Sequence, residues 1–176
     1  KQAADLDPAT AEAWTVLGLL GTAVGDWYVG LGDAEALKQY AYGDLYFGKA
    51  CKADPRSYEA FLARGRMLSH AAPEMARHGQ KPDPHLALSA KYLGTALEID
   101  PGAAEAWLAR AELERTGAAL LRARGEDAAH QVGKAEADYA KALELEPEPV
   151  EARAGRGWLR FGAERWAEAV ADFEAA

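Results

Sequence analysis

The side chains best suited to metal binding or nucleophilic chemistry in this sequence are four histidines and one cysteine. They are His70, His78, His85, His130 and Cys51. With a single thiol they show no zinc-ligand spacing, and although His78 and His85 could approach each other across a loop, no carboxylate or thiol is placed to complete a site. We therefore interpret the histidines as surface residues and predict no metal site.

Catalytic motifs are equally absent from the sequence. Cys51 is expected near the C-terminal end of a helix, where the negative end of the helix dipole raises the pKa of the thiol and weakens it as a nucleophile. The segment GLGDAE at 30–35 lacks the third glycine and the preceding strand of a nucleotide-binding loop, so a turn explains it. No Walker loop, kinase catalytic loop, G-x-S-x-G or H-E-x-x-H motif occurs. We predict that the chain is not an enzyme and binds no cofactor.

Composition limits the possible classes further. Apolar residues make up 49% of the chain, and Ala, Leu and Glu outnumber the β-branched residues, a balance that favours helices. A net charge of -8 disfavours nucleic acid as a ligand. No apolar run approaches the roughly 20 residues of a membrane span, and the first residues do not resemble a signal peptide. We expect a soluble chain without membrane insertion, and the single cysteine favours a cytoplasmic location.

The elements that must position these residues repeat along the chain. Pro8, Pro55 and Pro101 each follow Asp and Pro147 follows Glu, at separations of 47, 46 and 46 residues. An Asp can cap a helix N-terminus and proline is tolerated at the first helical position, while the residue before proline ends the preceding helix. The junctions therefore predict an all-α fold of antiparallel helix hairpins, with the Asp as N-cap and the proline as first helical residue.

Small residues recur at matched positions within each unit. Trp14, Leu17 and Gly18 have the W-x2-L-G spacing, and Ala169 and Phe173 have the A-x3-F spacing, so the chain resembles the tetratricopeptide repeat family over its whole length. The small positions are Gly18, Gly65, Ala111 and Gly157 on first helices and Gly43, Ser89, Ala135 and Ala169 on second helices. The predicted core residues, four positions after the second set, are Phe47, Leu93, Tyr139 and Phe173. The resemblance implies a right-handed α-solenoid, a superhelix of antiparallel hairpins.

The period of about 46 residues exceeds the usual 34 or so of that family, which predicts lengthened helices. We expect turns at 30–33, 79–84 and 125–127. Residues 1–6 are expected to be the tail of a preceding helix, followed by repeats at 7–54, 55–100, 101–146 and 147–176, the last of ordinary length. Pro73 predicts a kink or early stop near Ala72, and the segment 78–85 is expected to be the longest loop.

The resemblance also implies a peptide-binding groove lined by the inner stripe of the first helices. Its candidate residues are Glu12, Thr15, Leu19, Glu59, Leu62, Arg66, Glu105, Leu108, Glu112, Glu151 and Trp158. Some family members clamp a C-terminal carboxylate with lysine and asparagine, but this chain has no asparagine and a glutamate in each first position. A basic and apolar partner fits better. The alternative for the glutamates is helix stabilisation through the macrodipole, and Arg64, Arg110 and Arg156 are expected to pair with neighbouring acids.

Two functions remain open from the sequence. The first is a non-catalytic scaffold or adaptor that binds a protein or peptide in its groove. The alternative is a regulatory or assembly segment of a larger protein, for example a bacterial signalling kinase or an envelope machine, stacked on its own flanking repeats. Because both ends interrupt a repeat, we also expect exposed stacking faces and possible self-association.

Overall fold

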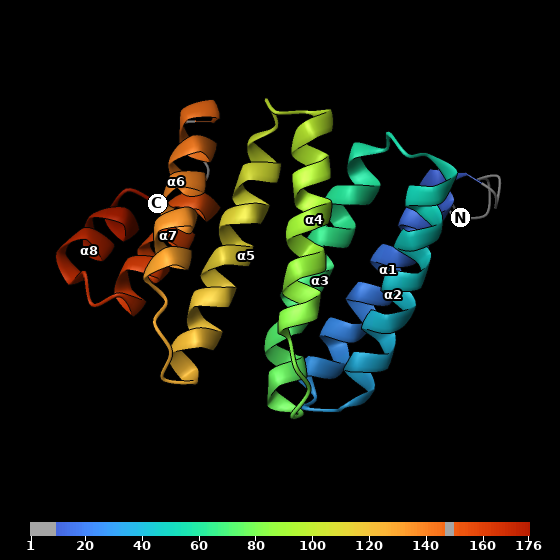
Figure 1. The fold of residues 1–176 in the computed structure, drawn as a ribbon, viewed down its shortest axis with the longest axis horizontal. Helices are drawn as coiled ribbons and strands as arrows, with labels where there is room; N and C mark the ends of the chain where they lie inside the picture. Colours follow the sequence, from blue (N-terminus) through green and yellow to red (C-terminus); the bar gives the residue numbers. More distant parts are fainter. Residues whose placement is uncertain (1–9, 147–149) are drawn as a thin grey trace. The chain divides into compact units, whose positions relative to one another are not determined.

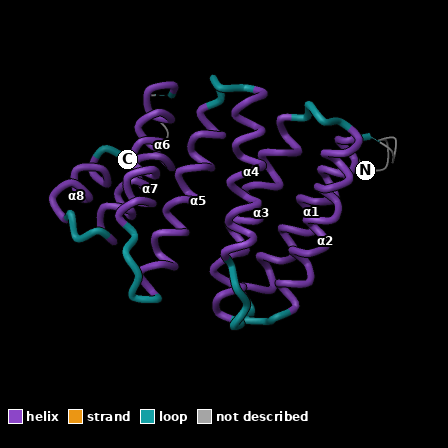
Figure 2. The backbone as a smooth tube through the Cα atoms, in the orientation of Figure 1, coloured by secondary structure: helices purple, strands orange, loops and turns teal. Residues whose placement is uncertain are grey.

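The computed structural model describes residues 10–146 and 150–176, and within these ranges it contains eight α-helices and no β-strand (Figures 1 and 2). The helices are α1 (Ala11–Gly30), α2 (Glu35–Ala53), α3 (Tyr58–Arg77), α4 (Asp83–Ile99), α5 (Ala104–Ala123), α6 (Ala129–Leu145), α7 (Val150–Gly162) and α8 (Trp166–Glu174). The predicted all-α class is therefore confirmed. The chain forms two compact units, Lys1–Ile99 with α1 to α4 and Asp100–Ala176 with α5 to α8.

In the first unit, successive helices pack as hairpins. Helix α1 lies against α2 and α3 lies against α4, while α3 also contacts both α1 and α2 (Figure 1). The buried core between the two hairpins is apolar and draws on α2 and α3. It consists of Ala36, Tyr40, Phe47, Met67, Leu68 and Ala71. Two hairpins thus share one core in this unit.

The second unit repeats this arrangement with shorter final helices. Helix α5 packs on α6, α7 packs on α8, and α7 also contacts α6 and α5. Its core cluster is Ala111, Ala135, Tyr139, Ala152 and Leu159. Helices α7 and α8 have 13 and 9 residues, whereas α5 and α6 have 20 and 17.

The small positions bring paired helices into close contact. A Cβ added to Gly18 would lie 2.6 Å from the Phe47 ring, and one added to Gly65 would lie 2.6 Å from Leu93. Ser89 is completely buried, and its hydroxyl donates a 2.7 Å hydrogen bond to the Gly65 carbonyl. In both hairpins of the first unit, a small residue of the first helix therefore packs against a large residue of the second helix.

Three of the four predicted core residues are buried. Phe47, Leu93 and Tyr139 have no exposed surface. Phe173 was also predicted to be core but is 37% exposed, because its ring packs on Gly157 and Trp158 of α7 and no helix of the described residues follows α8 to cover it. The expected burial of this residue is wrong.

The predicted helix starts are also wrong. Helices α3 and α5 begin three residues after Pro55 and Pro101. Asp54 and Asp100 do not cap them: each carboxylate accepts a hydrogen bond from the backbone N–H two residues later, at 2.8 and 2.9 Å, and so closes a turn. The N-cap of α3 is Ser57, whose hydroxyl accepts from the Ala60 N–H. The junctions at Pro8 and Pro147 lie outside the described residues.

The hairpin turns lie where glycines predict them. Gly32, Gly79 and Gly125 have φ of 70°, 71° and 73°, values that glycine adopts without steric cost. Helix α3 does not stop at Ala72 but continues through Pro73 to Arg77, since buried residues on both sides of the proline hold it in place. The loop 78–82 is no longer than the loop 124–128, so the prediction of a longest loop there is wrong.

Candidate binding surfaces

In the first unit, the predicted groove residues lie on α1 and α3, which contact each other. Glu12 and Glu59 are exposed, and Leu19 of α1 exposes 51% of its surface. Positions 12, 15 and 19 share one face of α1 because they are separated by three and four residues. This part of the surface combines carboxylates with an exposed leucine.

Other predicted residues of this unit are placed differently. Thr15 is partly buried, and its hydroxyl donates to the Ala11 carbonyl at 2.8 Å. Leu62 is buried at 6% exposure, so its side chain belongs to the interior. Arg66 is exposed on α3.

In the second unit, the predicted residues divide into exposed and structural ones. Glu105 and Glu151 are exposed. Leu108 packs against the core cluster, and Glu112 accepts hydrogen bonds from the Tyr139 hydroxyl and from Arg115. The Glu112 carboxylate therefore stabilises the fold of this unit. The sequence does not distinguish a glutamate exposed for ligand contact from one that stabilises the fold, because both can occur on the inner stripe.

Trp158 is 57% exposed and belongs to an aromatic cluster of the second unit. Its ring lies 5.8 Å from that of Phe161 and 5.1 Å from that of Phe173, and the Phe161 ring lies 4.8 Å from that of Trp166. We call these four side chains the terminal aromatic cluster. Its edge-to-face contacts hold the rings in place while they remain exposed.

The glutamate column also has a local role. Glu12, Glu59, Glu105 and Glu151 are each the second residue of their helix. At this position a carboxylate interacts favourably with the positive end of the helix dipole, by about 0.3–1 kcal/mol. Ligand contact and helix stabilisation are compatible with each other at these four positions.

The three equivalent arginines, Arg64, Arg110 and Arg156, pair with acids, as predicted. Arg64 binds Asp44 through two hydrogen bonds of 2.8 and 3.1 Å, and the corresponding shortest contacts of Arg110 with Asp138 and of Arg156 with Asp172 are both 2.7 Å. Burial opposes the charge on Arg64, but its hydrogen bonds and attraction to Asp44 raise the pKa of the guanidinium above its usual value. The sequence alone did not indicate that Asp44, Asp138 and Asp172 accept the hydrogen bonds of these arginines.

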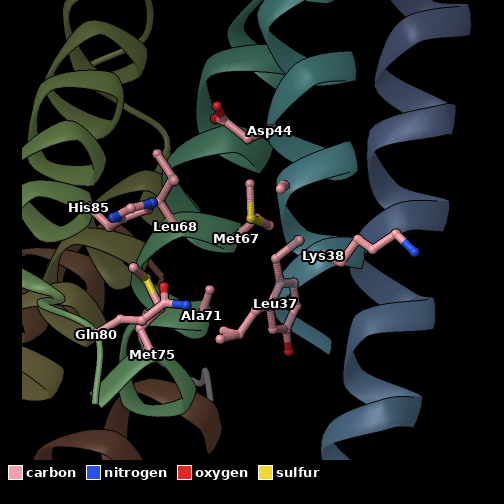
Figure 3. Close-up of a pocket in the computed structure, with 11 residues that line it drawn as sticks. Leu37, Lys38, Asp44, Met67, Leu68, Ala71, Met75, Gln80 and His85 are labelled. Carbon is pink, nitrogen blue, oxygen red and sulfur yellow. The ribbon is translucent and has the colours of Figure 1, made fainter. Parts of the chain in front are cut away.

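A pocket of about 420 Å³ lies in the first unit between α2, α3 and the start of α4 (Figure 3). Its apolar wall includes Met67 and Met75, the only two methionines of the chain. His85 lines it from α4, and the buried Nδ1 of this histidine has no hydrogen-bond partner. Sequence reasoning missed this pocket, although two methionines eight residues apart on one helix face were a signal for it.

The environments of His78 and Cys51 are set by neighbouring charged side chains and by burial. His78 Nε2 lies 2.8 Å from the buried Glu74, and within the described residues no group of three potential ligands could hold a metal ion. The pKa of Cys51 is raised, mainly by burial, while the nearby Arg64 opposes the shift. The predicted direction is therefore confirmed, but burial rather than the helix dipole is the main cause.

None of the helices in the described ranges combines the length and the apolar character needed to cross a bilayer. Comparison of the chain with protein-family models and with curated proteins found no match. The fold and the surfaces described above define an all-α protein of packed helix hairpins. The first helix of each hairpin exposes a face with acidic or apolar side chains.

Proposed function

We propose that this chain is a non-catalytic scaffold that binds a protein or peptide segment with basic and apolar side chains on its first-helix faces. The observation that carries the proposal is the half-exposed Leu19 on the same face of α1 as the exposed Glu12, together with the exposed Glu59 on the contacting helix α3. Exposed apolar surface bordered by charge is typical of interaction sites. Exposed carboxylates together with an exposed leucine favour a ligand that supplies both lysine or arginine and an apolar side chain.

The proposal includes a tetratricopeptide-like right-handed superhelix and a cytoplasmic location. The repeated contact of a small residue with a large one between paired helices supports the first. The single, half-buried cysteine supports the second. Neither nucleic acid nor a cofactor has a part in this function.

A peptide titration tests the proposed surface. The probes are two labelled helical peptides of equal length, one of Lys and Leu and one of Glu and Leu, with binding measured by fluorescence anisotropy. We expect the Lys/Leu peptide to bind the chain, and the double variant Glu12→Lys/Glu59→Lys to weaken this binding at least about tenfold. The double variant Glu98→Lys/Glu146→Lys changes the net charge equally at exposed second-helix ends and should bind nearly as the unaltered chain.

Leu19→Ala tests the apolar part of the same surface. Its matched control is Leu45→Ala on α2, because Leu45 is 53% exposed and Leu19 is 51% exposed. Only Leu19→Ala should weaken binding. If the two charge variants, or the two leucine variants, bind the Lys/Leu peptide equally, the first-helix face is not the binding surface.

A second candidate function is a regulatory or assembly segment of a larger protein, for example a bacterial signalling kinase or an envelope machine. The large exposed side chains of α1, Leu20 at 59% and Trp27 at 61%, favour it. Coding sequence next to this segment distinguishes the two functions. Kinase signatures or further repeats there support the larger protein, and a polar capping helix followed by a stop codon supports the free scaffold.

A further inference from the structure

Within each unit, the second hairpin packs on the first through the same register positions. The second helix of the first hairpin contributes Tyr40 and Phe47 in α2, or Val132 and Tyr139 in α6, and we call these trailing positions. The next first helix contributes Met67 in α3 or Leu159 in α7, and we call these leading positions. Because Met67 is 2% exposed and Leu159 is 1% exposed, both junctions are closely packed.

Each junction also contains an ion pair. Asp44 of α2 binds Arg64 of α3 at 2.8 Å, and Glu136 of α6 binds Arg160 of α7 at 3.1 Å. Asp44 and Glu136 are equivalent trailing positions, each one residue after the small residue of its helix. Arg64 and Arg160 occupy positions of the repeat that differ by four residues, which is one helical turn. In both units, therefore, the trailing acid binds an arginine on the leading face of the next helix.

Among the helices of the described residues, none precedes α1 to cover its leading positions. Leu20 is equivalent to Met67 and Leu159 but is 59% exposed. The positions of the two arginines are occupied by Leu17 and Gly21, and α1 has no charged residue between Glu12 and Asp26. The leading face of α1 is thus uncharged and exposed, whereas the equivalent faces of α3 and α7 carry an arginine and are packed against a neighbouring helix.

The same trailing positions of α8 are exposed as well. Trp166, Val170 and Phe173 correspond to Tyr40, Asp44 and Phe47, and the first two are 53% and 52% exposed. Val170 therefore stands where the junction within each unit has an acid, Asp44 or Glu136. Trp166 and Phe173 belong to the terminal aromatic cluster, and aromatic side chains contribute strongly to interfaces.

The changes at the two faces match each other. At the internal junctions a trailing acid meets a leading arginine, whereas at the free faces the acid is replaced by Val170 and the arginine by Leu17. Burying only one member of an ion pair leaves an uncompensated charge, which is strongly unfavourable. A face without the acid therefore fits a face without the arginine, and both occur in this chain.

We propose that a second copy of this chain docks the leading face of its α1 on the trailing face of α8, so that the hairpins of two copies pack as neighbouring hairpins do within one unit. The contact is heterologous, since it joins two different surfaces. A complex of two copies leaves the leading face of one copy and the trailing face of the other available, so association continues with concentration. Peptide binding through Glu12 and Leu19 of α1 and Glu59 of α3 is a separate property, because it uses a different face of α1.

Mixing two blocked variants tests this interface. Leu20→Glu blocks the leading face and Val170→Glu blocks the trailing face, and molar mass is measured by light scattering over a range of concentrations. We expect the unaltered chain to form species that grow with concentration and each variant alone to weaken association at least about tenfold. An equimolar mixture should form a complex of two chains and nothing larger, because only one intact pair of faces remains.

Leu45→Glu is the control, because Leu45 is an exposed leucine on α2 outside both faces. It should associate as the unaltered chain does. Circular dichroism of each variant checks that the helices are retained. In addition, Leu17→Arg and Val170→Asp should each weaken association, while the chain with both should regain it by rebuilding the ion pair of the internal junctions.

Several outcomes overturn the proposal. One is an unaltered chain that stays monomeric at every concentration. Another is a folded blocked variant that still associates as the unaltered chain does, which indicates an interface between identical faces. A mixture of the two blocked variants that remains monomeric also contradicts the proposed interface. None of these outcomes affects the peptide titration, which uses other residues.

Discussion

Asp44 of α2 holds Arg64 of α3 by two hydrogen bonds, and the same guanidinium lies 4.2 Å from the centre of the Tyr92 ring of α4. One side chain therefore connects three helices of the first unit. In the second unit the position of Tyr92 is occupied by Asp138 and Asp172, and Arg110 and Arg156 bind these acids within their own hairpins. The partner of each arginine therefore depends on whether the second helix of its hairpin has a tyrosine or an aspartate at this position.

The ion pair between Asp44 and Arg64 should contribute measurably to stability. Their side chains are 36% and 16% exposed, and the contact is bidentate. A double-mutant cycle with Asp44→Ala and Arg64→Met, followed by urea unfolding, should give a coupling energy of about 1–2 kcal/mol. The more exposed pair of Glu35 and Lys38 should give less than about 0.5 kcal/mol. Equal coupling in both pairs would contradict the structural role of Arg64.

Close approach of α1 and α2 should make Gly21 intolerant of a side chain. A Cβ at Gly21 would lie 2.9 Å from the backbone nitrogen of Gly43, and backbone cannot rotate away. We expect Gly21→Ala to lower the free energy of unfolding by about 1–3 kcal/mol. At Gly94 in α4 an added Cβ meets nothing within 4 Å, so Gly94→Ala should stabilise the chain by about 0.5–1 kcal/mol. Thermal unfolding of both variants measures these opposite signs.

The hydroxyl of Tyr139 should make stability depend on pH in the alkaline range. Burial, then the charge of Glu112 and the hydrogen bond to it, raise the pKa of Tyr139 well above its usual value. The unfolded chain loses this proton at about pH 10 and the folded chain retains it, so the contribution is present below about pH 10 and is lost as pH rises further. Tyr139→Phe should cost about 1–2 kcal/mol at neutral pH.

The difference between the unaltered chain and Tyr139→Phe should become smaller above about pH 10. Denaturant unfolding at a series of pH values measures it. Comparison with Tyr139→Phe removes the contributions of other titrating groups, since both proteins share them. A difference that grows with pH would show that the hydroxyl is not held neutral by the fold.

The thiol of Cys51 should react slowly in the folded chain. Its pKa is raised, mainly by burial, so the thiolate fraction at neutral pH is below that of an ordinary cysteine. We expect reaction with a disulfide reagent to be at least about tenfold slower in the folded chain than in urea. Arg64→Met removes a positive charge that lowers this pKa, and should slow the reaction further. A faster reaction of that variant would contradict the effect of Arg64.

Several features could be predicted from the sequence because they depend on local chemistry. Glycines that adopt positive φ mark the hairpin turns at Gly32, Gly79 and Gly125. The 46-residue period identifies Phe47, Leu93 and Tyr139 as buried residues, because a repeated position in similar hairpins meets a similar neighbour. The helical class follows from composition, because Ala, Leu and Glu outnumber the β-branched residues.

Other features were decided only by the tertiary structure. The turn formed by Asp54 delays the start of α3 to Tyr58. Phe47 and Tyr139 are buried in clusters that include residues of α3 and α7, whereas no helix of the described residues follows α8 to cover Phe173. The partner of Arg64, the structural role of Glu112 and the pocket beside Met67 depend on side chains from other helices. A repeat in the sequence specifies which positions are equivalent, but burial and pairing are properties of the neighbours that each position meets in space.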